Sequence, residues 1–147
     1  MQFQPKSKSE IEKERVAQGA WPVGNYEFEV LDRGKVGTFE FFTEERKSQN
    51  GNEMIQLVLS VTHPIGIKRV LRDYLLDSVA VKLHDAAAAC GLIDQYNAGS
   101  LIADDFVGEK GVLKLGIEKD ATGLYADRNN VRGYVIGDVV VSMEAPF

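Results

Sequence analysis

The last third of the chain limits most strongly which folds the sequence can adopt. Two strand-like segments, Gly111 to Ile117 and Asn130 to Ile136, flank a loop at Glu118 to Asn129 and follow an alanine-rich helix predicted over 79–90. A late hairpin behind one helix is compatible with few small folds. The loop also carries basic residues and a tyrosine among turn formers, a combination that suits nucleic-acid phosphates and bases better than a small metabolite.

The preceding segments predict further strands. Tyr26 to Val30 alternates apolar and charged residues, Thr38 to Thr43 is rich in phenylalanine, and Met54 to Val61 places an aliphatic residue at every second position. A turn at Ser48 to Asn52 precedes the third of these, and a further strand is expected over Ile67 to Leu76. The order predicts a mainly β fold, a five-stranded OB-type barrel with one helix between strands 3 and 4. Another α+β meander remains an alternative.

The N-terminal segment alternates charges densely and has few apolar residues, so it is predicted to be a short helix or a mobile arm. Ser9 and Glu12 have the spacing of a capping box, and Gly19 is expected to end the helix. The predicted organisation is an N-terminal arm at 1–19, an OB-like domain at 20–137 and a C-terminal tail at 138–147.

Composition excludes several classes of protein. The 147 residues are 44% hydrophobic and 27% charged, which is typical of one globular domain. A formal net charge of −5 argues against holding duplex DNA by bulk charge, although a local basic groove remains compatible with it. The single cysteine, Cys90, excludes an internal disulfide and a cysteine-based zinc site. No apolar run is long enough to span a membrane and no signal peptide is recognisable, so a soluble intracellular protein is expected.

Two motifs carry a resemblance to a known family. They are Trp21-Pro-x-Gly-x-Tyr-x-Phe-Glu-Val30 and Val107-Gly-Glu-Lys-Gly-x-x-Lys-Leu-Gly-Ile-Glu-Lys119, the second being the more specific. Over about residues 20–135 the chain resembles a phage-encoded family of unknown function found among replication and recombination genes. Members look like OB-type single-stranded-DNA-binding proteins, so the resemblance implies that fold and that activity. It assigns no DNA contacts.

Single-stranded nucleic acid is held by cations that follow the phosphates and by aromatic faces that stack on bases. Three regions of the sequence offer both: the excursion after the first strand, the third long strand and the final hairpin. The predicted nucleic-acid-binding residues are Arg33, Lys35, Phe39, Phe41, Arg46, Lys47, Arg69, Arg72, Tyr74, Lys114, Lys119, Tyr125, Arg128 and Arg132.

Strand alternation sharpens these predictions. Phe39, Phe41 and Phe42 cannot all point inward on one strand, so at least one should be exposed or should cover another element. Arg72 and Tyr74 should share one face of their strand, with Arg69 on the other. Each region also has a plainer interpretation: phenylalanines that plug the barrel end, a solvated strand face with an Arg–Asp pair, and a hairpin loop with ordinary surface charge.

No residues indicate catalysis or a cofactor. His63 and His84 lack ligands at metal-binding spacing, Cys90 is best explained as a small buried residue, and Asp104-Asp105 as helix caps. The Gly108-to-Gly111 segment lacks the phosphate-loop pattern. The sequence therefore predicts no enzyme, no cofactor and no metal site.

The predicted function is non-catalytic single-stranded-DNA binding in phage replication or recombination, in the cytoplasm of an infected bacterial host. Expected partners are single-stranded DNA, with RNA as the alternative, a recombination or replication protein, and further copies of the chain, but no membrane. The alternative function is an OB-like adaptor that binds a recombinase, polymerase or host factor. The terminal Pro146-Phe147 is similar to the partner-recruiting tip of bacterial single-stranded-DNA-binding proteins, and the valine run 139–141 could form an edge strand.

Overall fold

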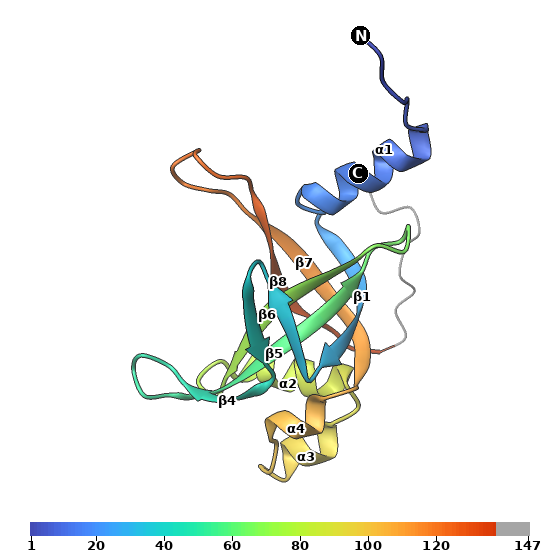
Figure 1. The fold of residues 1–147 in the computed structure, drawn as a ribbon. Coiled ribbons are helices and arrows are strands. Elements are labelled where there is room, and N and C mark those ends of the chain that lie inside the picture. The colour runs from blue at the N-terminus through green and yellow to red at the C-terminus, as the bar shows by residue number, and fades with distance from the viewer. Residues whose placement is uncertain (138–147) are drawn as a thin grey trace.

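The computed structural model describes residues 1–137, which form a mainly β fold (Figure 1). In chain order its elements are α1 (Lys8–Gln18), β1 (Gly24–Leu31), β2 (Arg33–Val36), β3 (Phe39–Phe42), β4 (Glu44–Lys47), β5 (Glu53–Thr62), β6 (Lys68–Leu76), α2 (Ala80–Ala89), α3 (Ile93–Asn97), α4 (Ala103–Phe106), β7 (Lys110–Glu118) and β8 (Arg128–Val135). Within this part of the chain, no helix is long and apolar enough to cross a membrane. The expected tail features at 139–141 and 146–147 lie outside the described residues.

Six strands form one antiparallel sheet. Its order is β4-β5-β1-β7-β8, and β6 pairs along β5 as well. β1 and β4 are collinear pieces on one edge of β5, since β1 pairs with residues 58–62 and β4 with residues 53–56. The predicted mainly β class is confirmed. The five-stranded barrel is not, because the sheet has six strands and its ladder does not close between β6 and β8.

The core lies on the inner face of this sheet. β5 buries Ile55, Leu57, Leu59 and Val61, as its alternating pattern predicts. Further fully buried large side chains include five from the entry to β1, from β1 itself, from α4 and from β7: Trp21, Tyr26, Phe106, Leu113 and Leu115. Helix α2 adds the small residues Ala86 and Ala87, and its C-cap adds Cys90, which let the helix lie close to the sheet. The lower edge of the sheet is thereby closed by helices (Figure 1).

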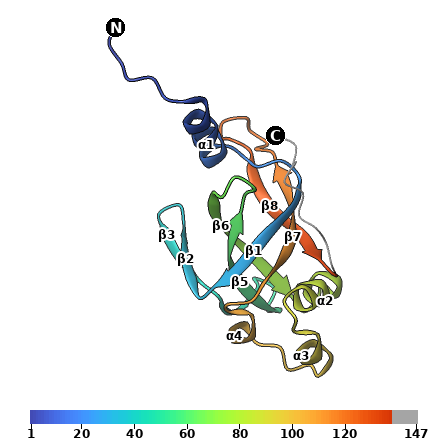
Figure 2. The same ribbon diagram turned by 90° about the vertical axis from the view of Figure 1, so that its right-hand side faces the viewer.

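The excursion after β1 is a separate hairpin that packs on the outer face of the sheet. β2 and β3 pair only with each other, and Figure 2 shows them standing beside β6. A Cβ at Gly34 would lie 3.1 Å from both Val58 and Val70, which is tighter than most Cβ contacts, so glycine favours this close approach. The hairpin therefore buries Val58 on the outer face. The predicted strand at 38–43 is found as β3, whereas β2 and β4 were not predicted.

Helix α1 crosses the end of the sheet opposite α2 (Figure 1). Its N-cap is Ser7, whose hydroxyl accepts a hydrogen bond from the Glu10 N–H at 3.1 Å, so the predicted cap at Ser9 is wrong by two residues. The predicted stop at Gly19 is confirmed. The helix buries no side chain, so the contacts that attach it to the sheet are made at its last turn.

Candidate nucleic-acid interface

A groove of about 550 Å³ lies between the unpaired edges of β6 and β8. One wall ends at Val36 of β2, and the other is formed by the chain that enters β8. The predicted residues that line it are Arg69, Arg72, Tyr74 and Arg128. It also takes in the last turn of α1 and its exit, Gln18 to Ala20. The open seam of the sheet thus forms a cleft that adjoins three of the predicted cations and the predicted aromatic residue Tyr74.

Arg72 forms an aromatic and cationic platform with two neighbours. Its guanidinium carbon lies 3.7 Å from the centre of the Phe41 ring and 5.8 Å from that of Tyr74. Its Nη1 also donates a hydrogen bond to the Tyr74 hydroxyl at 2.8 Å. Stacking on Phe41 positions the exposed guanidinium without neutralising its charge. The predicted Arg72–Tyr74 face is therefore present, and β3 adds an aromatic ring to it.

The hairpin presents its two faces to different surroundings. Gly34 and Phe41 are cross-strand partners and face β6, and alternation puts Val36 and Phe39 on the same face. Phe39 is 70% exposed there, which confirms that one of the three phenylalanines lies outside the core. Arg33 and Lys35 alternate with these residues, so they lie on the face turned away from the groove.

Arg69 is held by internal contacts. Its guanidinium stacks 4.5 Å from the Trp21 ring centre, and Nη1 donates to the Asn129 side-chain oxygen at 3.0 Å. Its Nη2 donates to the carbonyls of Val16, Ala17 and Gly19 at the end of α1. Burial is the main cause that lowers the pKa of Arg69, and the ordinary pKa of an arginine is far above neutral pH. Arg69 thus joins α1, β6 and β8 at one end of the groove.

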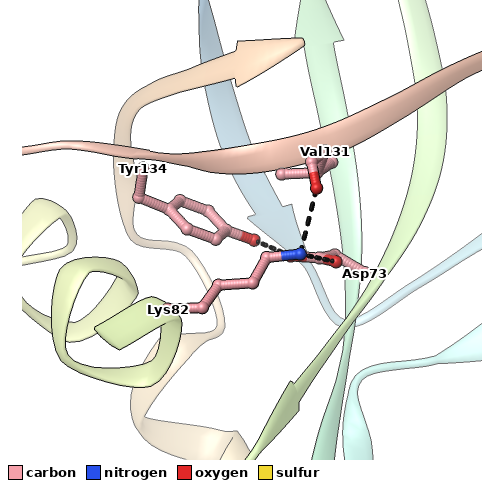
Figure 3. A network of polar contacts seen from close by, with 4 residues as sticks. All are labelled: Asp73, Lys82, Val131 and Tyr134. Atoms are coloured by element: carbon pink, nitrogen blue, oxygen red, sulfur yellow. Dashed lines mark hydrogen bonds and ion pairs between the residues drawn. The ribbon is translucent and has the colours of Figure 1, made fainter. Parts of the chain in front are cut away.

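A buried polar network crosses the open seam below the groove (Figure 3). The Tyr134 hydroxyl donates to one Asp73 oxygen at 2.7 Å, and the Lys82 ammonium contacts the other at 2.7 Å. Lys82 also donates to the Val131 carbonyl at 3.0 Å. Burial raises the pKa of Asp73, with Lys82 and Tyr134 opposing the rise, and burial also raises the pKa of Tyr134 well above its usual value. Side chains therefore join β6 to β8 where backbone pairing is absent.

The remaining predicted cations are dispersed. Arg46 and Lys47 line a different cleft, of about 570 Å³, at the helical end of the sheet, where Arg46 donates to Gln56. Lys114 is exposed on β7, and the Arg132 side chain lies over Gly116. The structure does not bring these four to the groove.

The loop between β7 and β8 projects from the body of the fold (Figure 1). Its tip is organised by Asp120, whose carboxylate accepts hydrogen bonds from Thr122 and from the Leu124 and Tyr125 amides. These bonds, led by that from Thr122, lower the Asp120 pKa. Lys119 is exposed, and Tyr125 is 76% exposed on this tip. Both predicted residues are therefore available to a ligand, although they do not line the groove.

Charge in the groove is balanced. Arg69, Arg72 and Arg128 are matched there by Asp73, Glu118 and Asp127. Because Arg69 and Asp73 have internal partners, the groove offers Arg72 and Arg128 to a ligand against two exposed acids. A polyanion would therefore depend more on stacking than on bulk attraction.

Two parts of the site were not predicted from the sequence. Asn129 bonds both Trp21 backbone groups, the Gly116 carbonyl and Arg69, so it fixes the base of the projecting loop. The polar network of the seam joins residues 61 positions apart, Asp73 and Tyr134. No local pattern indicated the role of Asn129, because its partners Trp21 and Arg69 lie 108 and 60 positions away in the chain.

Among residues 1–137 there is no cluster of three or more histidine, cysteine or acidic residues that could hold a metal ion. Burial raises the pKa of the Cys90 thiol to about 12, as expected for a packed rather than a reactive cysteine. The carboxylate of Asp105 accepts from the Ile102 N–H, which confirms its predicted capping role. Compared with known proteins, the sequence matches no family model and no curated protein.

Proposed function

We propose that the protein is a non-catalytic single-stranded-DNA-binding protein whose domain is of OB type. The topology supports this fold: the long strands run β6-β5-β1-β7-β8, and α2 stands between the third and the fourth of them in sequence. In an OB-fold, the strand that corresponds to β6 lies on the binding face, flanked by the loops after the first and fourth strands. The β2–β3 hairpin and the β7–β8 loop occupy those two positions here.

The observation that carries the proposal is the platform of Arg72, Phe41 and Tyr74, of which Arg72 and Tyr74 line the groove and Phe41 stacks on Arg72. The 3.7 Å stack holds a cation and an aromatic ring together, and the hydroxyl bond at 2.8 Å fixes both to β6. A phosphate can pair with the outer edge of the guanidinium while a base stacks on a neighbouring ring. Phe39 extends the same aromatic face towards the tip of the hairpin. Sequence-independent binding of a flexible strand needs this combination of groups.

Fluorescence anisotropy with a short poly-dT strand at two salt concentrations tests this function. With at least Arg72 and Arg128 as cations available in the groove, log K should fall with log salt at a slope at least as steep as about −1.4. Arg72→Ala should weaken binding and reduce this slope by about 0.7. Arg33→Ala is the matched control, because it also removes an arginine, but from the face of the β2–β3 hairpin that is turned away from the groove. Absence of binding at low salt, or equal losses in both variants, would refute the proposal.

The role in phage replication or recombination, and hence the cytoplasm of an infected bacterium as location, rests on the resemblance of the two sequence motifs. Single-stranded RNA is the competing ligand, and the same titration with poly-U distinguishes the two.

A second function is favoured by the exposed apolar tip of the β7–β8 loop. Leu124 is 80% exposed and Tyr125 is 76% exposed, and residues of this kind are commonly used to contact proteins. In this case the protein would be an adaptor for a recombinase, polymerase or host factor. Two double variants separate the functions. Leu124→Ala with Tyr125→Ala should abolish partner capture by an adaptor, whereas Arg72→Ala with Tyr74→Ala should weaken poly-dT binding by the groove. A protein that loses partner capture with the first variant and keeps its DNA affinity with the second would displace the first proposal.

A further inference from the structure

The last turn of α1 forms one end of the groove. Gln18, Gly19 and Ala20 belong to its lining, and the helix lies across that end of the sheet (Figure 1). α1 buries no side chain, and Val16 is its apolar residue packed against the core. The helix is therefore attached mainly through the polar groups of its C-terminus.

Those polar groups converge on Arg69 and Trp21. The Arg69 Nη2 lies 2.9 Å from the Val16 carbonyl, 3.3 Å from that of Ala17 and 2.8 Å from that of Gly19. The Trp21 indole donates a further bond to the Val16 carbonyl at 2.8 Å. Carbonyls at a helix C-terminus carry partial negative charge, so α1 presents to Arg69 a weak analogue of an anion.

We propose that α1 is a displaceable lid on the groove, and that its C-terminal carbonyls compete with a nucleic-acid phosphate for Arg69. The inference rests on the proposed function, because it requires a phosphate chain in the groove. A phosphate bears a full charge and accepts two parallel bonds from a guanidinium, so it is the stronger ligand. With 11 residues and no buried side chain, α1 is also close to the length at which an isolated helix is marginal.

Competition for Arg69 has a consequence that a fixed helix would not have: destabilising α1 at its N-terminus, away from the groove, should raise the affinity for DNA. Ser7→Ala removes the N-cap hydroxyl, which bonds to Glu10 and lies at the end of α1 away from the groove. Loss of an N-cap changes a helix equilibrium by about fivefold, so the apparent Kd for poly-dT should fall by up to about that factor. Ser9→Ala is the matched control, since it makes the same chemical change inside the helix and should leave the Kd unchanged or slightly raised.

Amide hydrogen exchange on the full chain gives a second measurement. Saturating poly-dT should speed exchange of the α1 amides, and the emission of Trp21, the single tryptophan, should shift as its bond to Val16 is lost. If poly-dT binds while α1 stays equally or better protected, or if Ser7→Ala weakens binding, α1 is a fixed part of the site and the lid is refuted. If poly-dT does not bind at low salt, the proposed function fails and the lid fails with it.

Discussion

Replacing Lys82 by methionine tests whether the buried network holds the open seam of the sheet. Lys82 is the cation of this network, with its ammonium 2.7 Å from Asp73 and 3.0 Å from the Val131 carbonyl (Figure 3). Methionine keeps the length of the side chain but removes the charge and both bonds. The Asp73 carboxylate would then retain one side-chain partner, Tyr134, in surroundings where it is only 7% exposed.

The expected loss of stability follows from the burial of the two partners. Breaking a buried ion pair from one side costs about 3–5 kcal/mol, because the remaining charge stays uncompensated. The Lys82 side chain is 24% exposed, which places Lys82→Met near the low end, about 3 kcal/mol. Asp73→Asn should cost less, about 1–2 kcal/mol, because the Lys82 ammonium can reach water and the amide oxygen can still accept from Tyr134.

Urea unfolding followed by Trp21 fluorescence measures both variants and their combination. Combining Lys82→Met with Asp73→Asn should lower the free energy of unfolding by less than the sum of the two single losses, with a difference of at least about 1 kcal/mol. The Lys82→Met loss should also shrink in acid. Burial raises the Asp73 pKa, so the folded state binds the proton first and the unpaired charge disappears as the pH falls through that pKa. A Lys82→Met loss below about 1 kcal/mol would refute a structural seam, and a larger loss for Asp73→Asn than for Lys82→Met would refute the unpaired carboxylate as the cause of the loss.

Three further predictions concern the core. Burial, followed by the charge of Arg69, lowers the pKa of His63. The neutral ring therefore stabilises the fold fully above the ordinary histidine pKa, and this stability is lost as the pH falls through the lowered pKa. His63→Asn should remove this part of the pH dependence of the free energy of unfolding. Gly111→Ala would place a Cβ 2.9 Å from a backbone oxygen of α2 and should cost about 1–3 kcal/mol in urea unfolding. Gly133→Ala, whose Cβ would meet no atom within 4 Å, should cost clearly less, and equal losses would contradict the clash at Gly111. Cys90, with its pKa raised to about 12, should react with a thiol reagent at pH 8 only after unfolding, and rapid reaction of the folded protein would show that it is accessible.

The long elements could be predicted because each carries its own pattern. β5 places an aliphatic residue at every second position from Ile55 to Val61, and a pattern of that length outweighs local ambiguity. β2 and β4 have four residues each and no alternation of burial that marks a core face, so their strands depend on pairing with β3 and β5. The same pairing decided which cations reach the groove. β4 returns to β5 instead of extending the hairpin, and this carries Arg46 and Lys47 to the other cleft.

The site was predictable where one strand sufficed. Arg72 and Tyr74 are two residues apart on β6, so alternation alone put them on one face. Arg33 and Lys35 required the register of the hairpin, which depends on its turn and on the close approach at Gly34. The internal role of Arg69 required knowing where α1 ends in space. Contacts between segments far apart in the chain were beyond a reading of local pattern.

Mapping where a strand of nucleic acid touches the protein tests the central claim most directly. A poly-dT strand containing 5-iodouracil, photo-crosslinked to the full chain and followed by peptide mass spectrometry, should label the β3 segment that holds Phe39 and Phe41 and the β6 segment that holds Tyr74. Stacked aromatic rings are the groups such a base contacts. Crosslinks confined to Tyr96 on α3, at the helical end of the fold, or no crosslinks under conditions that give saturation, would contradict a binding site at the open seam.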